Sequence, residues 1–224
     1  MQNLNVLYED NHIIVVEKPV NIPSQADKTG DIDMLTIIKQ YIKEKYNKPG
    51  NVYLGLVHRL DRPVGGVMVF AKTSKAASRL SEEVRLKQFE KKYLVIANGK
   101  FEKDKGELED YLLKNQAKNM SKVVKEGTKN SKLAKLDYEV IKYDPDLNLS
   151  VVKINLHTGR HHQIRVQFAS RGYPLCGDQR YGKSDKTQIA LCAYKLEFIH
   201  PTTKQLMKFE IEKPLDTYWT DFTL

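Results

Sequence analysis

The 224-residue chain has few of the residues that build disulfide frameworks, and no stretch that could span a membrane. It contains two cysteines, Cys176 and Cys192, and neither lies in a metal-ligand spacing or a CxxC motif. We therefore expect two reduced thiols in a cytoplasmic protein. No apolar run approaches the ~18 residues of a membrane-spanning helix. The opening MQNLNVLYED lacks the basic and apolar regions of a signal peptide, so we expect a soluble protein without a membrane partner.

Acidic residues are scarce relative to basic ones. Lysine and arginine number 37 against 28 aspartates and glutamates, a formal net charge of +9. This surplus favours a polyanionic partner, with nucleic acid first and an anionic membrane second. Within 114–135 every charged residue but Glu126 is a lysine. The stretch is either a solvated basic face or a phosphate-binding arm. Its lysine spacing is typical of a helix, whereas Gly127 and the neighbouring polar residues favour a loop.

Carboxylates are also missing around the histidines of the second half. His157 and His161 stand four residues apart, but Gly159 between them disfavours a helix, and no acid lies within eight positions of this pair or of His162. Zinc sites usually recruit cysteine or carboxylate as well, so we expect no metal site. Next to the predicted helix start, Arg160, Gln163 and Arg165 instead offer donors to an anion or a base edge.

Hydrophobic periodicity predicts a mixture of strands and helices. In the strand-like segment 147–156 the alternation slips by one residue at Val152, which indicates a β-bulge. In the last predicted helix Gly172 is a candidate C-cap. The pattern predicts an α+β fold around a mixed, largely antiparallel sheet. The predicted strands are 12–19, 65–72, 91–99, 147–156, 189–201 and 206–214, and the predicted helices are 31–46, 74–88 and 159–172.

One carboxylate, Asp61, is bracketed by Arg59 and Arg62 in the stretch HRLDR. Arginines that lie close to an aspartate keep it ionised, and a shielded, ionised carboxylate can act as a covalent nucleophile. Taken alone, however, the stretch is more simply a turn with an exposed ion pair worth about 0–1 kcal/mol. Tyr93, in the predicted strand KKYLV, is by itself most simply a core residue.

Taken together, the motifs resemble the RluA-type family of RNA pseudouridine synthases. The stretch HRLDRPVGGVMVFAKT resembles the family signature, and KKYLVIANG resembles its tyrosine motif. The stretch LHTGRHHQIRVQFASRGYPLCGDQRYG resembles its third motif, and EKPVNIPS and LCAYKLEFIHP resemble its opening and closing strands. The motifs occur in family order over about 7–214, which is far more specific than any single match. The resemblance implies flanking helices and loops that form a central RNA-binding cleft.

The implied activity is the isomerisation of uridine to pseudouridine in structured RNA, ribosomal or transfer. The target nucleotide leaves its stack, the N1–C1′ bond breaks, the uracil turns over, and C5 bonds to C1′. This chemistry needs no redox change, metal or cofactor. Many relatives carry an N-terminal S4-type RNA-binding domain. We expect a short form without it, a single catalytic domain over 1–224, because the signature begins within the first ten residues or so. A lysine-rich loop or arm at about 114–135 would then help to hold the RNA, and we expect a monomer without an obligate protein partner.

The resemblance assigns the catalytic roles. Asp61 is the nucleophile and attacks uracil C6 or ribose C1′. Tyr93 stacks on the base and can move a proton. Arg165 pairs with the nucleophile and holds it ionised. The competing interpretation is an RNA-binding or RNA-chaperone module that keeps the fold without the chemistry; the three residues occurring together favour an enzyme.

Further residues are candidates for RNA contact. Arg59 is similar to an arginine that contacts RNA near the vacated stack, and Leu191 falls where an apolar residue packs near the uracil. The sequence departs from the family at Val64 and Gly65, where Thr-Ser is common, and at His161, where Thr or Ser is usual. The remaining candidates for contact with RNA are Arg62, Arg160, Gln163, Lys118, Lys122 and Lys125.

Overall fold

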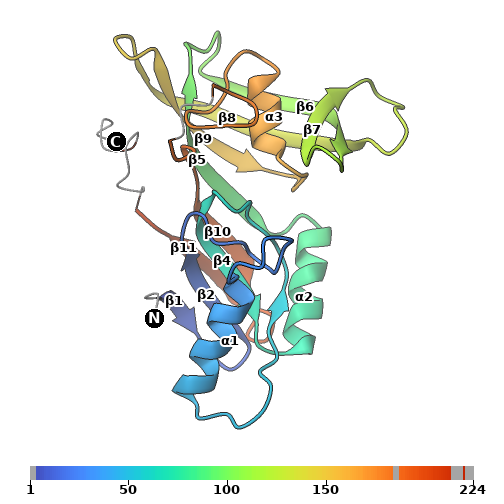
Figure 1. Ribbon diagram of the computed structural model, residues 1–224, viewed down its shortest axis with the longest axis vertical. Helices are drawn as coiled ribbons and strands as arrows, with labels where there is room; N and C mark the ends of the chain where they lie inside the picture. The colour runs from blue at the N-terminus through green and yellow to red at the C-terminus, as the bar shows by residue number, and fades with distance from the viewer. Residues whose placement is uncertain (1–3, 184–186, 213–218, 220–224) are drawn as a thin grey trace. The chain divides into compact units, whose positions relative to one another are not determined.

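The computed structural model describes residues 4–183, 187–212 and 219. The chain divides into two compact units (Figure 1), each built largely on antiparallel strands. The first unit comprises Met1–Glu90 and Ala193–Ile211, and the second comprises Lys91–Cys192 and Glu212–Leu224. The predicted α+β architecture is confirmed, whereas the RNA-binding cleft stays a prediction.

The first unit carries two helices and a sheet with the strand order β1-β2-β4-β10, to which β11 adds on β10 and β3 on β4. Strand β2 pairs antiparallel with both β1 and β4. Four consecutive residues of β2, from Ile13 to Val16, are fully buried, so this strand is covered on both faces. The elements are β1 (Asn5–Glu9), β2 (Ile13–Lys18), α1 (Met34–Lys45), β3 (Gly55–Leu56), β4 (Gly65–Ala71), α2 (Ser74–Arg85), β10 (Leu191–Ile199) and β11 (Leu206–Glu210).

Polar side chains start both helices of the first unit. The carboxylate of Asp33 accepts hydrogen bonds from the first turn of α1, and the hydroxyl of Thr73 accepts one from Ala76 in α2. Helix α2 then buries Ala76 and Leu80 in a core that includes Val69 of β4 and Phe198 of β10. The sequence predicts both helices, the first over 31–46 and the second over 74–88, and the structure places them at Met34–Lys45 and Ser74–Arg85.

The second unit has the strand order β5-β9-β8-β6-β7, and every neighbouring pair in this run is antiparallel. Helix α3 packs against β6 and β7 (Figure 1). Gly172, with φ +85°, ends it: the Tyr173 N–H donates to the Phe168 carbonyl, a Schellman-type closure that confirms the predicted C-cap. The elements are β5 (Glu90–Asn98), β6 (Lys105–Asn115), β7 (Met120–Val124), β8 (Lys132–Asp144), β9 (Leu149–Leu156) and α3 (Gln163–Ala169).

Several features differ from the sequence-based expectation. Strands β1, β3, β6, β7 and β8 were not among the predicted strands. The lysine-rich stretch 114–135 is neither a helix nor a plain loop, because it contains all of β7 and the start of β8. The irregularity predicted at Val152 is present, but the extra residue lies in the partner strand: Val140 and Lys142 of β8 oppose Val152 and Val151. A one-residue slip in the apolar alternation of one strand indicates a bulge in the strand pair. It does not identify the strand that contains the extra residue.

Among the helices of the described residues, none combines the length and the apolar character that crossing a bilayer requires.

Gly66 provides a test of the packing in the first unit. Its φ is +134°, and a Cβ atom there would lie 2.3 Å from the Ala193 carbonyl oxygen. We expect Gly66→Ala to lower the free energy of unfolding by about 2–4 kcal/mol through overpacking and backbone strain. Gly50→Ala, where no atom lies within 4 Å of the added Cβ, is the control. Urea unfolding of both variants checks this, and equal stabilities would contradict it.

Candidate active site

Asp61 opens a tight turn directly before β4. Its carbonyl accepts a 2.9 Å hydrogen bond from the Val64 N–H, which closes the turn. On the other side, the buried Ser24 hydroxyl donates to the Leu60 carbonyl at 2.8 Å and accepts from the Leu60 N–H at 3.1 Å. The backbone is therefore held before and after Asp61, while the Asp61 side chain itself is partly exposed.

A buried lysine lies within the same loop. Lys18, the last residue of β2, is 1% exposed, and its Nζ donates to the carbonyls of Pro19 (2.8 Å), Arg62 (3.1 Å) and Val64 (2.8 Å). An ammonium group has three N–H donors, so all of them are used. Two of the three acceptors belong to the Asp61 turn, so Lys18 ties the turn to the opening strand.

Burial lowers the pKa of Lys18 to about 7, against the favourable charge of Asp61, which raises it. The Arg62 charge acts in the same direction as burial. The charge of Lys18 therefore depends on its carbonyl partners and on Asp61. Sequence reasoning missed this residue, although a lysine closes a strand whose first four residues are apolar.

The two arginines beside Asp61 have different surroundings. Arg62 forms ion pairs with Asp31 (2.6 Å) and Asp27 (3.1 Å) in the loop before α1. Arg59 is exposed. The predicted RNA contact of Arg62 would compete with this acidic loop, whereas Arg59 faces solvent.

The structure shows how closely the turn packs at Val64 and Gly65, the two departures from the family pattern that follow Asp61. Val64 is 2% exposed and supplies one carbonyl to Lys18. A Cβ atom at Gly65 would lie 3.2 Å from Val20 Cγ1 and 3.3 Å from the Lys18 carbonyl oxygen. The turn therefore packs so closely on the end of β2 that a side chain at this position would need its neighbours to move.

In the second unit, Tyr93 lies on β5 opposite Ile154 of β9 and is 6% exposed. Leu191, the first residue of β10, is also 6% exposed. Both side chains are buried, and their contact with a base stays a prediction.

Arg165 forms a buried, two-pronged ion pair with Asp178. Its Nε and one terminal nitrogen donate to the two carboxylate oxygens at 2.8 and 2.7 Å, and the side chains are 5% and 0% exposed. Burial alone would raise the pKa of Asp178, but the Arg165 guanidinium and the backbone N–H groups of Arg180 and Tyr181 hold it below its usual range. The pair fixes the plane of the Arg165 guanidinium.

The predicted pairing of Arg165 with Asp61 joins residues of different units, and it stays a prediction. Sequence reasoning missed Asp178 as the partner of Arg165. The sequence carries no signal for this pairing, because the acid follows the helix by about a dozen residues. The turn at 177–182 places its carboxylate beside Arg165.

Polar side chains of the loop before α3 form hydrogen bonds within the loop and with carbonyls of β8. The Gln163 Oε1 accepts from the Thr158 hydroxyl (2.7 Å) and the Arg160 N–H (3.0 Å), and its Nε2 donates to the Lys135 carbonyl (3.1 Å). Arg160 donates from Nε to the Leu133 carbonyl at 2.7 Å. Gln163 therefore shapes the loop, and its predicted RNA contact would require breaking these bonds.

His161, the third departure from the family pattern, ties this loop to β7. The Ser121 hydroxyl donates to the His161 carbonyl at 2.8 Å and lies 3.0 Å from His161 Nδ1. The Tyr181 hydroxyl accepts from the Ser121 N–H at 2.6 Å and lies 3.0 Å from His162 Nδ1. The start of α3 is thereby anchored to β7. We call the hairpin formed by β6 and β7 the lysine-rich hairpin.

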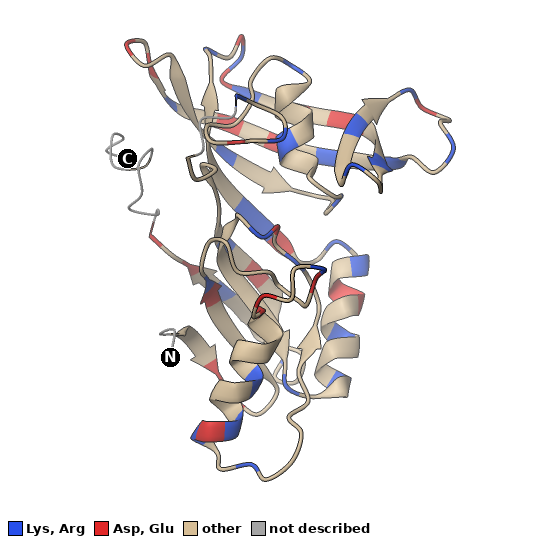
Figure 2. Cartoon of the chain, viewed as in Figure 1, with Lys and Arg blue, Asp and Glu red and all other residues tan. Residues whose placement is uncertain are grey.

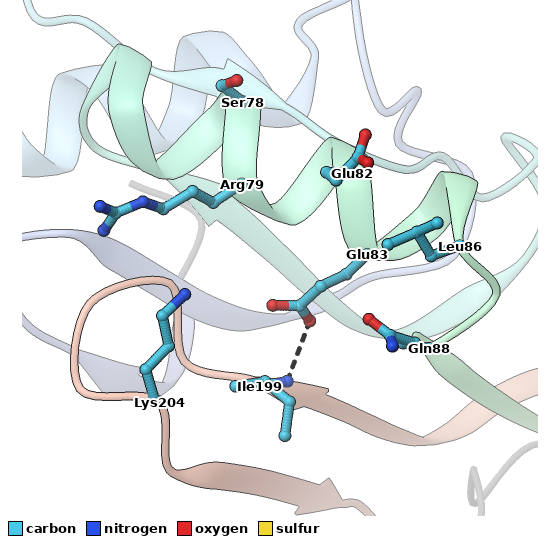
Figure 3. A pocket seen from close by; sticks show the side chains of 8 residues that line it. All are labelled: Ser78, Arg79, Glu82, Glu83, Leu86, Gln88, Ile199 and Lys204. Atoms are coloured by element: carbon cyan, nitrogen blue, oxygen red, sulfur yellow. Dashed lines mark hydrogen bonds between the residues drawn. The ribbon is translucent and has the colours of Figure 1, made fainter.

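A cavity of about 440 Å³ lies beside α2 (Figure 3), away from every predicted site residue. Glu83 points into it and accepts a 3.0 Å hydrogen bond from the Ile199 N–H. Burial raises the pKa of Glu83. Across the described ranges there is no grouping of three or more His, Cys, Asp or Glu side chains that could hold a metal ion.

The burial of Lys18 predicts a pH dependence of stability. Its folded pKa of about 7 lies below the ordinary 10.5, so between these values the unfolded chain binds a proton that the folded chain does not. The free energy of unfolding therefore rises with pH across this window, by at most about 1.4 kcal/mol per unit. We expect Lys18→Met to lose this rise and the exposed Lys28→Met to keep it.

Urea unfolding at about pH 7 and about pH 10 measures the effect. If wild type and Lys18→Met changed in parallel over this range, the lowered pKa would be wrong.

The Arg165–Asp178 pair predicts a large loss of stability on neutralisation. Asp178→Asn leaves a buried guanidinium without its counter-charge, which costs about 3–5 kcal/mol. Asp137→Asn breaks a half-exposed pair with His157 and costs about 1 kcal/mol or less. Chemical denaturation separates the two, and similar losses would argue that the Arg165–Asp178 pair is solvated.

Comparisons with known proteins agree with the motif order. The family model described as RNA pseudouridylate synthase matches residues 12–170. An uncharacterised RNA pseudouridine synthase of Aquifex aeolicus is 36% identical over 94% of this chain and 70% of its own length. A protein of Buchnera aphidicola named ribosomal large subunit pseudouridine synthase C is 34% identical over 97% of this chain and 69% of its own length.

A solved structure titled Human RNA Pseudouridylate Synthase Domain Containing 4 covers 94% of this chain and 89% of its own, with a TM-score of 0.80 at 20% identity. This last likeness concerns the fold. The family match extends across more than half of the sequence and contains the Asp61 turn, Tyr93 and Arg165. The chain belongs to the RNA pseudouridylate synthase family, whose members are isomerases that act on uridine in RNA.

Proposed function

We propose that Asp61 is the nucleophile of this enzyme and that its substrate is a flipped-out uridine in ribosomal or transfer RNA. The observation that carries the proposal is the Asp61 turn, which lies within the family match and whose backbone is held by Ser24 and Lys18. A nucleophile must be held in one geometry while its side chain stays accessible. The partly exposed Asp61 on its fixed turn meets both requirements.

A single carboxylate is sufficient for this reaction. Glycoside hydrolysis normally uses two carboxylates, because an acid protonates the leaving group and a second residue attacks or activates water. Here the leaving uracil is recaptured rather than lost. The Asp61 carboxylate adds to uracil C6 or ribose C1′, the N1–C1′ bond breaks, and the C5–C1′ bond forms. Asp61 is then released as the C5 proton is lost and N1 gains a proton.

Tyr93 and Arg165 serve the same reaction in this proposal. Stacking of the uracil on Tyr93 would contribute roughly 1–3 kcal/mol, as for other contacts between aromatic side chains and bases. The guanidinium of Arg165, oriented by Asp178, would hold the Asp61 carboxylate ionised. The family match crosses from the first unit into the second, which supports one catalytic domain built from both.

Large-subunit ribosomal RNA is the first candidate substrate. Three proteins from Buchnera aphidicola, all at least 30% identical to this chain, carry the name ribosomal large subunit pseudouridine synthase C. The net charge of +9 supports binding to a polyanion. We further propose that the enzyme works in the cytoplasm as a monomer.

Removing the Asp61 carboxylate tests the assignment. We expect Asp61→Asn to form no pseudouridine, with a rate at least about 10³-fold below wild type, while folding is kept because the side chain is partly exposed. Asp146→Asn, at another exposed aspartate, should remain fully active. RNA from cells that lack the gene serves as substrate, and pseudouridine is quantified by mass spectrometry of nucleosides. A product yield from Asp61→Asn near that of wild type would exclude the assignment.

A further inference from the structure

The strands β6, β7 and β8 have two faces that differ in charge. Side chains alternate along each strand, so residues two apart share a face. Leu112 of β6 and Ala134 of β8 pack against Val166 of α3. We call the face with these residues the α3 face and the opposite one the outer face.

Strand register places the exposed lysines on these faces. Lys114 pairs with Ser121, whose hydroxyl bonds to the His161 carbonyl at the start of α3. Lys132 pairs with Leu112. Both lysines are therefore on the α3 face, and both are exposed. Lys122 neighbours Ser121 in the chain and is therefore on the outer face.

Acidic residues pair with two of the lysines on the outer face, Lys105 and Lys135. Lys135 forms an ion pair with Glu109 across β8 and β6, and Lys105 forms one with Glu139 at 2.7 Å. A phosphate approaching this face would meet carboxylates as well as ammonium groups.

On the α3 face, in contrast, lysine charges are left without acidic partners in the part of the chain that the structure describes. Its acid, Asp110, accepts a hydrogen bond from Gln167 (2.7 Å) and pairs with Arg171 (2.9 Å). Within the described residues, Lys114 and Lys132 form no ion pair with a carboxylate. Their positive charge is thus available to an anion, and Figure 2 shows further basic positions around the same hairpin.

The turn between β6 and β7 is also held by contacts with residues that flank α3. The amide oxygen of Asn119 lies 3.1 Å from His161 Nε2, and Arg180 donates to the Lys118 carbonyl at 3.5 Å. A fixed basic surface loses less conformational entropy on binding than a mobile arm does.

We propose that the RNA backbone runs along the α3 face of this sheet, with Lys114 and Lys132 on its phosphates, and that Lys122 faces away from it. This inference rests on the proposed function and narrows it, because it says which side of the lysine-rich hairpin meets the substrate. The occupant is RNA rather than an acidic protein, because the chain belongs to a family that acts on uridine in RNA.

Two double variants with equal charge change test it. Lys114→Gln with Lys132→Gln removes two charges from the α3 face, and Lys105→Gln with Lys122→Gln removes two from the outer face. Binding to a transcript of large-subunit ribosomal RNA is measured over a range of salt concentrations. For the α3-face variant we expect about tenfold weaker affinity at ~0.15 M salt and a log–log salt slope smaller by about 1.4. The outer-face variant should stay within about twofold of wild type.

Equal losses in both variants, or a larger loss in the outer-face variant, would overturn the inference. Melting temperatures of both variants should match wild type, since all four side chains are exposed. Pseudouridine formation by wild type on the same transcript is measured in parallel. A wild-type protein that binds with the predicted face preference but forms no pseudouridine on any RNA tested would contradict the proposed function and leave the face assignment standing.

Discussion

The hydrogen bonds from the Lys18 ammonium to three carbonyls are the constraint on which the candidate site depends. A buried cation is costly unless its donors are satisfied, and here two of the three acceptors are carbonyls of the turn that starts at Asp61. The turn therefore cannot move away from β2 without exposing an unsatisfied charge. This links the end of the opening strand to the carboxylate proposed to attack the substrate.

A second buried charge shapes the other unit. The Arg165 guanidinium is directed by Asp178, and the N–H groups of Arg180 and Tyr181 bind the same carboxylate. The turn that carries Asp178 also carries Tyr181, whose hydroxyl binds the backbone of β7. The position of Arg165, the fold of the turn after α3 and the docking of the lysine-rich hairpin are thus one connected arrangement.

Local patterns predicted most of the fold because each depends on neighbours in the chain. The helix that begins at Ser74, the strand that ends before Pro19 and the cap at Gly172 all follow from adjacent residues. Strands β1, β3, β6, β7 and β8 were not predicted. The structure of β7 depends on its pairing with β6, and its own five residues show no clear alternation.

The family resemblance found the residues of the candidate site, but not the residues that hold them. Lys18 and Asp178 act through partners 44 and 13 residues away, and periodicity carries no information about such pairs. The same holds for His161, whose ring lies within hydrogen-bond distance of Ser121 and Asn119, about 40 residues away in the chain.

The most direct measurement is the titration of the Lys18 side chain by nuclear magnetic resonance of its Nζ and Cε. The account predicts a pKa of about 7 in the wild-type protein and a lower value in Asp61→Asn, because the Asp61 charge supports the ammonium form. A Lys18 pKa near the ordinary 10.5, unchanged by neutralising Asp61, would contradict the buried link between this lysine and the Asp61 turn.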